Sequence, residues 1–188
     1  MNPSYELLQK QAESNRQIYT LLKFACRCDH VTSLNFNTYE SVTAFLAAKC
    51  STVRARSLTA IDEKLKENYE KIAKEIEVDL EFLPVVDVIE PTDLLYINTP
   101  AEGNFRASEL AKFSAQVKKY ILLPNTETNG LQPSNAIKLA DDQKPIGLVF
   151  GINHFLQTHD DWFILEHDDV EPGMTVLVNR KNVANAYS

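Results

Sequence analysis

Glycine is scarce in this chain of 188 residues: there are five, and the first of them is Gly103. An α/β domain that binds a nucleotide usually places glycine in its first strand-to-helix turn, where the backbone comes close to the ligand. The turn expected at 33–41 carries asparagines and a tyrosine instead. This absence argues against an ordinary nucleotide-binding loop in the first half of the chain.

Other features are lacking as well. No apolar run approaches the roughly 18–20 residues that span a bilayer, and the first residues have neither the basic start nor the apolar core of a secretory signal. The net charge of −7 argues against nucleic-acid binding, which relies on clustered lysine and arginine. Three cysteines without a secretory context indicate free thiols. We therefore expect a cytoplasmic protein without membrane or nucleic-acid partners.

What is present indicates one α/β domain. The composition, 44% hydrophobic and 24% charged, is typical of a globular protein, and the length fits a single domain over 1–188, with an N-terminal extension at 1–14 and a long loop at 125–145. Periodicity predicts helices in the second part of 5–26 and at 43–49, 60–76, 108–116 and 147–157. It predicts strands at 31–36, 53–58, 80–86, 93–98, 119–123, 162–166 and 175–178. These elements predict a three-layer sandwich around a mostly parallel, seven-stranded sheet, closed by an antiparallel C-terminal hairpin.

This order of elements resembles the class I S-adenosylmethionine-dependent methyltransferase fold. Several strings resemble a bacterial subgroup that includes cephalosporin-hydroxylase-like proteins. The strings are those at 30–48, Asp93-Leu94-Leu95-Tyr96-Ile97-Asn98-Thr99, Lys119-Tyr120-Ile121-Leu122-Leu123-Pro124-Asn125-Thr126, and the tail from 147 to 177. The resemblance spans about residues 15 to 180.

The resemblance also implies where the cofactor would bind. Members of the family usually carry an acid at the end of the first strand and two glycines before the helix. The matching positions here are Ser33, Asn35 and Tyr39, with Asn37 between them. A second family acid, which accepts both ribose hydroxyls, falls on Ser57. A neutral hydroxyl there makes a weaker hydrogen bond than a carboxylate would.

The remaining cleft positions follow the same pattern. The acid that the family places after the fourth strand falls on Asn98, and a nearby histidine falls on Ala101. After the fifth strand, a common His-Asp pair reads Pro124-Asn125. Asparagine brings no charge to neutralise a hard cation, and neither asparagine nor proline acts as a general base near neutral pH. We therefore expect no catalytic residue and no metal ligand at these positions.

Three functions remain open on these residues. The leading hypothesis is a pseudo-methyltransferase, which keeps the fold for binding a protein partner or for homo-oligomer assembly and needs no cofactor. The alternative is an active transferase that binds S-adenosylmethionine in an altered pocket, since methyl transfer can proceed by proximity and orientation. The third is a module for another small ligand, with Asn35, Asn37, Tyr39, Asn98 and Asn125 as a neutral polar lining.

Other polar clusters have simpler interpretations. Cys26 and Cys28, near His30 and Cys50, lack the spacing of a zinc knuckle, and Cys26 ends an apolar helical face, so we expect core packing. The triplets at 159–161 and 167–169 are each His-Asp-Asp, and we expect them to be loop residues at opposite ends of a strand that begins at Trp162. Arg54 and Arg56 occupy a predicted interior strand and either reach solvent or, for Arg56, bind an anion.

Overall fold

A computed structural model describes residues 6, 8–11, 15–34, 40–85, 87–132 and 146–182. The described chain divides into two compact units. The first contains residues 1–87 and 91–97, and the second contains 88–90 and 98–188. The described residues of the predicted N-terminal extension, 6 and 8–11, are helical.

Four parallel strands form the sheet of the first unit. They are β1 (His30–Leu34), β2 (Thr52–Ser57), β3 (Asp79–Pro84) and β4 (Thr92–Ile97). The strand β1 pairs in parallel with β2 and with β4, and β2 pairs in parallel with β3. Every residue of β4 is buried, as its continuous apolar run predicts for a central parallel strand.

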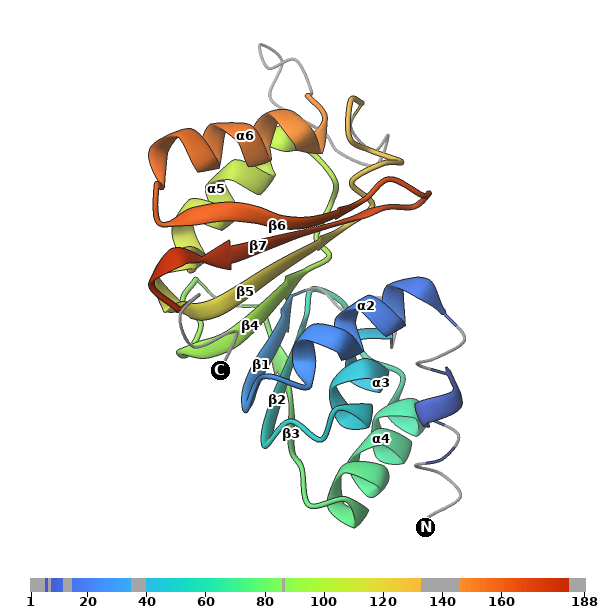
Figure 1. Cartoon of the computed structure of the whole chain (residues 1–188). Helices are drawn as coiled ribbons and strands as arrows, with labels where there is room; N and C mark the ends of the chain where they lie inside the picture. Colours follow the sequence, from blue (N-terminus) through green and yellow to red (C-terminus); the bar gives the residue numbers. More distant parts are fainter. Residues whose placement is uncertain are drawn as a thin grey trace. The chain divides into compact units, whose positions relative to one another are not determined.

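The helices of the first unit are α2 (Arg16–Ala25), α3 (Glu40–Ala47) and α4 (Glu63–Glu75), which cover one face of its strands (Figure 1). Asn15 caps α2 by accepting hydrogen bonds from two backbone N–H groups, and Asp62 caps α4 in the same way through Leu65. Every residue of α3 after Glu40 is buried, because these residues are small or apolar.

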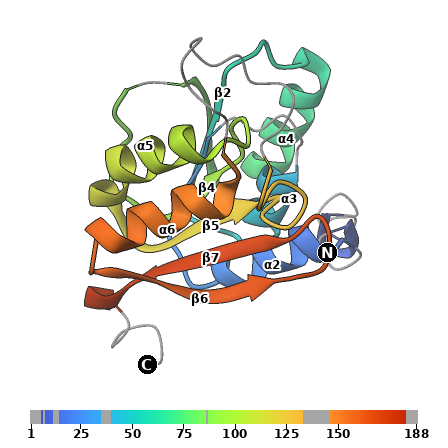
Figure 2. The same ribbon diagram turned by 90° about the horizontal axis from the view of Figure 1, so that it is seen from above.

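The second unit contains α5 (Gly103–Phe113), β5 (Val117–Pro124), α6 (Leu148–Thr158), β6 (Trp162–Asp168) and β7 (Met174–Asn179). The strand β7 is central and pairs antiparallel with both β5 and β6. The two helices lie side by side (Figure 2). The predicted hairpin is therefore confirmed, with its turn at 169–173.

The strand order of the seven-stranded sheet is β3-β2-β1-β4-β5-β7-β6. This order, with parallel pairing in the first unit and an antiparallel C-terminal hairpin, is that of the methyltransferase fold and confirms the predicted fold class. Among the described residues, no helix combines the length and the apolar character that crossing a bilayer requires.

Two predicted helix starts were too late. The helix α5 begins at Gly103 rather than 108, because Glu102 caps it by accepting a hydrogen bond of 2.8 Å from the Phe105 N–H. The helix α3 begins at Glu40 rather than 43. Of the predicted long loop, residues 125–130 form hydrogen-bonded turns and 131–132 a bend, whereas 133–145 lie outside the described residues.

Candidate functional site

The carboxyl ends of three strands meet in the first unit. The register aligns Leu34 of β1 with Arg56 of β2 and with Ile97 of β4, so all three strands end at nearly the same level. In an open α/β sheet, ligands bind outside the carboxyl ends of the strands. Two of the predicted site residues, Ser33 and Ser57, lie at this edge.

Ser33 is fully buried, and its hydroxyl lies 2.9 Å from the hydroxyl of Ser41 on α3. This hydrogen bond joins the end of β1 to the helix that covers it. Ser33, the position that the resemblance assigns to the family's first acid, therefore takes part in the packing of the core.

Ser57 ends β2 with only 9% of its surface exposed. Its hydroxyl accepts a hydrogen bond of 3.2 Å from the Thr59 N–H and lies 3.4 Å from the Thr59 hydroxyl. A hydroxyl has two lone pairs and one proton, so Ser57 can still make one neutral hydrogen bond to a ribose hydroxyl. A neutral hydroxyl makes a weaker hydrogen bond than the carboxylate that the family resemblance implies at this position.

The other predicted cofactor residues fall into two groups. Asn35, Asn37 and Tyr39 lie outside the described residues. Asn98 and Asn125 belong to the second unit and are partly exposed. Asn98 directly follows β4 of the first unit, and Asn125 directly follows β5.

Asn125 has a turn-forming role that its position explains. It has a positive φ of 61°, a conformation that asparagine tolerates better than most residues. Its N–H donates to the carbonyl of Gly173, and its carbonyl accepts from the N–H of Asn129. Asn125 is thus placed in a well-bonded turn.

One expectation about the cysteine cluster is corrected by the structure. Cys26 is exposed, so the expected core packing is wrong for this residue: it follows α2, whose apolar face ends at the buried Ala25. Cys28 and Cys50 are buried, and their thiols donate to the carbonyls of Phe24 and Ala25. Burial raises the pKa of the Cys50 thiol to about 12, which makes it unreactive.

The described residues contain no group of three or more histidine, cysteine or acidic side chains able to hold a metal ion.

The arginines of β2 are held by protein groups. Arg54 pairs with Glu81 on β3 at 3.2 Å. Arg56 is 3% exposed and donates to the carbonyl of Pro84 at 3.0 Å, so the expectation that it reaches solvent is wrong. The neighbouring strand supplies the acceptor, because β2 is an interior strand.

The two His-Asp-Asp triplets lie at opposite ends of β6, as predicted. His167 and Asp168 belong to the strand, however, and are not loop residues. The His167 ring bridges the hydroxyl of Thr175 at 2.9 Å and the carboxylate of Glu127 at 2.8 Å. This contact fixes the hairpin to the turn that follows β5.

A buried charged network around α5 was not expected. Arg106 is 1% exposed, donates to the carbonyl of Thr99 at 3.1 Å and approaches the Glu109 carboxylate at 3.8 Å. Glu109 accepts a hydrogen bond of 2.6 Å from the Thr99 hydroxyl. Glu102 is fully buried and accepts from the N–H groups of Phe105 and Ile146. The network fixes the segment between β4 and α5.

The sequence contains a signal for this network. Residues 102, 106 and 109 have the spacing of one helix face, and charged residues on a buried face are paired. The helix predicted to begin at 108 contains Glu109 but neither Glu102 nor Arg106, so the shared helix face was not recognised.

Glu109 predicts a pH dependence of stability. Burial raises the pKa of its carboxyl above the ordinary 4.5, against the opposing effect of Arg106. Above pH 4.5 the folded state then holds more protons than the unfolded state, so stability falls as pH rises until the folded carboxyl is ionised. The loss is about 1.4 kcal/mol for each pH unit in which only the folded carboxyl stays protonated.

Urea unfolding at a series of pH values above 4.5 measures this effect. Glu109→Gln is expected to flatten the profile relative to wild type, whereas Glu63→Gln, at an exposed position on α4, is expected to leave it unchanged. Parallel profiles for wild type and Glu109→Gln would contradict the assignment.

No protein-family model and no curated protein matches the sequence. Solved methyltransferase structures do match the fold. An O-methyltransferase from Bacillus cereus, in complex with S-adenosylhomocysteine, is 12% identical, with a TM-score of 0.60 over 95% of this chain and 91% of that one. The O-methyltransferase TomG of Streptomyces achromogenes, in complex with S-adenosylmethionine, is 11% identical, with a TM-score of 0.59 over 95% and 90%. A methyltransferase from Geobacter sulfurreducens is 14% identical, with a TM-score of 0.57 over 95% and 89%. At such low sequence identity, the similarity to these structures establishes the fold of the chain alone.

Proposed function

We propose that this chain is an S-adenosylmethionine-dependent methyltransferase whose cofactor pocket is built from neutral side chains. The observation that supports the proposal is the match over 95% of the chain to methyltransferases, two of which were solved with S-adenosylmethionine or its product. The sheet keeps the strand order of that fold, and the strands of the first unit end at a common edge.

The chain's own residues would bind the cofactor and orient the acceptor substrate. S-adenosylmethionine, when bound, supplies an activated methyl group. Ser57 would hold one ribose hydroxyl with a neutral hydrogen bond, and Ser33 would keep β1 fixed to α3. The matched positions offer no carboxylate for a general base or a cation, so rate enhancement would rest on proximity and orientation of the acceptor. Acceptors that are already nucleophilic suit such a site best.

The second candidate is a pseudo-methyltransferase that acts in binding or assembly. The hydrogen bonds that Ser33 and Ser57 already make favour this candidate. The Ser33 hydroxyl is buried against Ser41, and the Ser57 hydroxyl already bonds Thr59, so little capacity remains for a cofactor. Binding of S-adenosylmethionine separates the two candidates.

Calorimetric titration with S-adenosylmethionine and S-adenosylhomocysteine is the test. The methyltransferase proposal predicts binding in about the 10–100 μM range, weak because the ribose contact is neutral. Restoring the family's acid with Ser57→Asp is expected to tighten binding about tenfold. The matched control is Ser51→Asp, an exposed position just before the amino end of the same strand, which is expected to change nothing. Absence of binding in both wild type and Ser57→Asp would reject the proposal and favour the pseudo-methyltransferase.

A further inference from the structure

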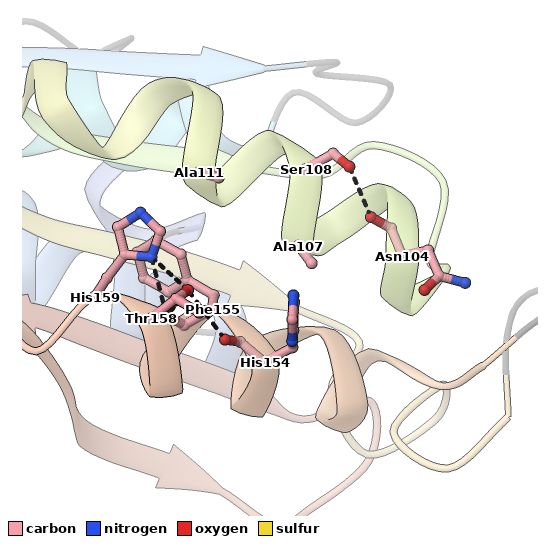
Figure 3. A pocket seen from close by; sticks show the side chains of 8 residues that line it. All are labelled: Asn104, Ala107, Ser108, Ala111, His154, Phe155, Thr158 and His159. Carbon is pink, nitrogen blue, oxygen red and sulfur yellow. Dashed lines mark hydrogen bonds between the residues drawn. The ribbon is translucent and has the colours of Figure 1, made fainter.

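A groove runs between α5 and α6, beyond the point where the two helices are in contact. The two helices meet near their amino ends, where a Cβ on Gly151 would overlap the carbonyl of Gly103. Farther along, α5 continues this face with Ala107 and Ala111, which are too small to fill the space. The result is a cavity of about 290 Å³ between the helices, shown in Figure 3.

The hydroxyl groups that line this groove donate their protons to backbone carbonyls of their own helices. Ser108 donates to the backbone carbonyl of Asn104 at 3.1 Å. Thr158 lies 3.2 Å and 3.1 Å from the carbonyls of His154 and Phe155, which can only accept. The proton of each hydroxyl is therefore directed into its own helix. The Ser108 oxygen keeps its lone pairs toward the groove, whereas the Thr158 oxygen also has a contact of 2.9 Å with Nδ1 of His159.

His159 extends the same pattern. Its Nδ1 lies 2.9 Å from the hydroxyl of Thr158 and 3.1 Å from the carbonyl of Phe155. Because the carbonyl can only accept, the proton of the neutral ring is assigned to Nδ1, which also places it against the Thr158 oxygen. Stacking on the Phe155 ring, with centroids 4.3 Å apart, fixes the orientation of the imidazole. Figure 3 shows the other nitrogen, Nε2, directed toward α5. In the neutral ring this nitrogen is a hydrogen-bond acceptor.

Beyond His159 the groove leads into a second cavity of about 510 Å³, which shares Ala111, Thr158 and His159 with the first. Asp160, Asp161 and Lys181 line it. Lys181 pairs with Asp161, so Asp160 leaves one negative charge in excess among these three groups. The chain as a whole also has a net charge of −7. A cation is favoured over an anion here.

We propose that this groove binds an aliphatic polyamine. Such a molecule carries several N–H donors on a flexible apolar chain. Its ammonium groups would meet the acceptors described above and Asp160, and its methylenes would lie along Ala107 and Ala111. The site is independent of the proposed transferase function: β5 runs from Val117, which lines the second cavity, to Pro124, about 25 Å away, before it reaches Asn125.

Titration calorimetry with spermidine at low ionic strength tests the proposal, since salt screens exposed charges. We expect a dissociation constant below about 1 mM, and no binding of the neutral diol 1,4-butanediol. Ala107→Leu fills the groove and is expected to weaken binding more than about tenfold. His159→Phe keeps the stacked ring but removes Nε2, and is expected to weaken binding about fivefold.

The matched control is Gln157→Leu, an exposed position on α6 that does not line either cavity and is expected to leave the affinity within about twofold. Thermal denaturation of each variant checks that it folds, and His159→Phe remains as a test if Ala107→Leu does not. Equal binding of the diol, unchanged spermidine affinity in the variants, or no heat from spermidine at about 5 mM would each overturn the proposal. None of these outcomes depends on whether S-adenosylmethionine binds.

Discussion

Replacing Gly151 by alanine is expected to lower the free energy of unfolding by about 3 kcal/mol. Two effects oppose each other in this substitution. Alanine is favoured over glycine inside a helix by about 1 kcal/mol, which would stabilise α6. A Cβ at this position, however, would overlap backbone atoms of Gly103, which cannot rotate away as a side chain can. The helices would have to separate, so the packing cost exceeds the gain in helix propensity.

Chemical denaturation of Gly151→Ala and of Asn153→Ala measures the effect. Asn153 is exposed on the same helix, and its replacement is expected to change stability by no more than about 0.5 kcal/mol. Stabilisation of Gly151→Ala would show that helix propensity prevails and that the two helices are not in backbone contact. The same variant should alter the groove, since it changes the place where α5 and α6 meet.

Replacing Arg106 by methionine is expected to destabilise the fold by about 3–5 kcal/mol. Arg106 and Glu109 are both buried, with side-chain exposures of 1% and 9%. Removing the guanidinium leaves a buried carboxylate near the Thr99 hydroxyl with its nearest positive charge gone. Leaving one charge of a buried pair costs far more than the net contribution of the intact pair, because the desolvation of the remaining group is not offset.

The double variant Arg106→Met with Glu109→Leu separates this explanation from a simple loss of packing. It removes both charges and keeps apolar volume, so it is expected to recover most of the stability that the single variant loses. Urea denaturation of the wild type, the single variant and the double variant gives the comparison. A double variant no more stable than Arg106→Met would contradict the idea that the unpaired carboxylate is the main cost.

The fold could be predicted from the sequence because periodicity reports burial. The continuous apolar run at 94–97 predicted a buried strand, and the short turn before Met174 predicted an antiparallel hairpin. The start of α5 could not be predicted in the same way. Gly103 and Asn104 are poor helix formers, and a tertiary contact and the Glu102 cap decide their conformation.

The candidate site was predictable only in part. Ser57 ends β2 and Ser33 lies one residue before the end of β1, whereas their part in a cofactor site stays a prediction. Their hydrogen-bond partners, Ser41 and Thr59, could not be inferred from residue type. The groove between α5 and α6 left no mark in the sequence, because it depends on how two helices cross.

The contact between Gly130 and Gly147 has a consequence for how the chain can be rebuilt. Gly147 has no room for a Cβ because the carbonyl of Gly130 occupies the space, and the Val149 N–H donates to that same carbonyl at 3.1 Å. The chain therefore returns at 147 to the place that it left at 130. A segment that joins two residues already in contact has only a short distance to span, so its length and sequence can vary. Stretches of different length, a reporter domain or a cleavable linker could replace 133–145 while the same two anchoring residues remain in place.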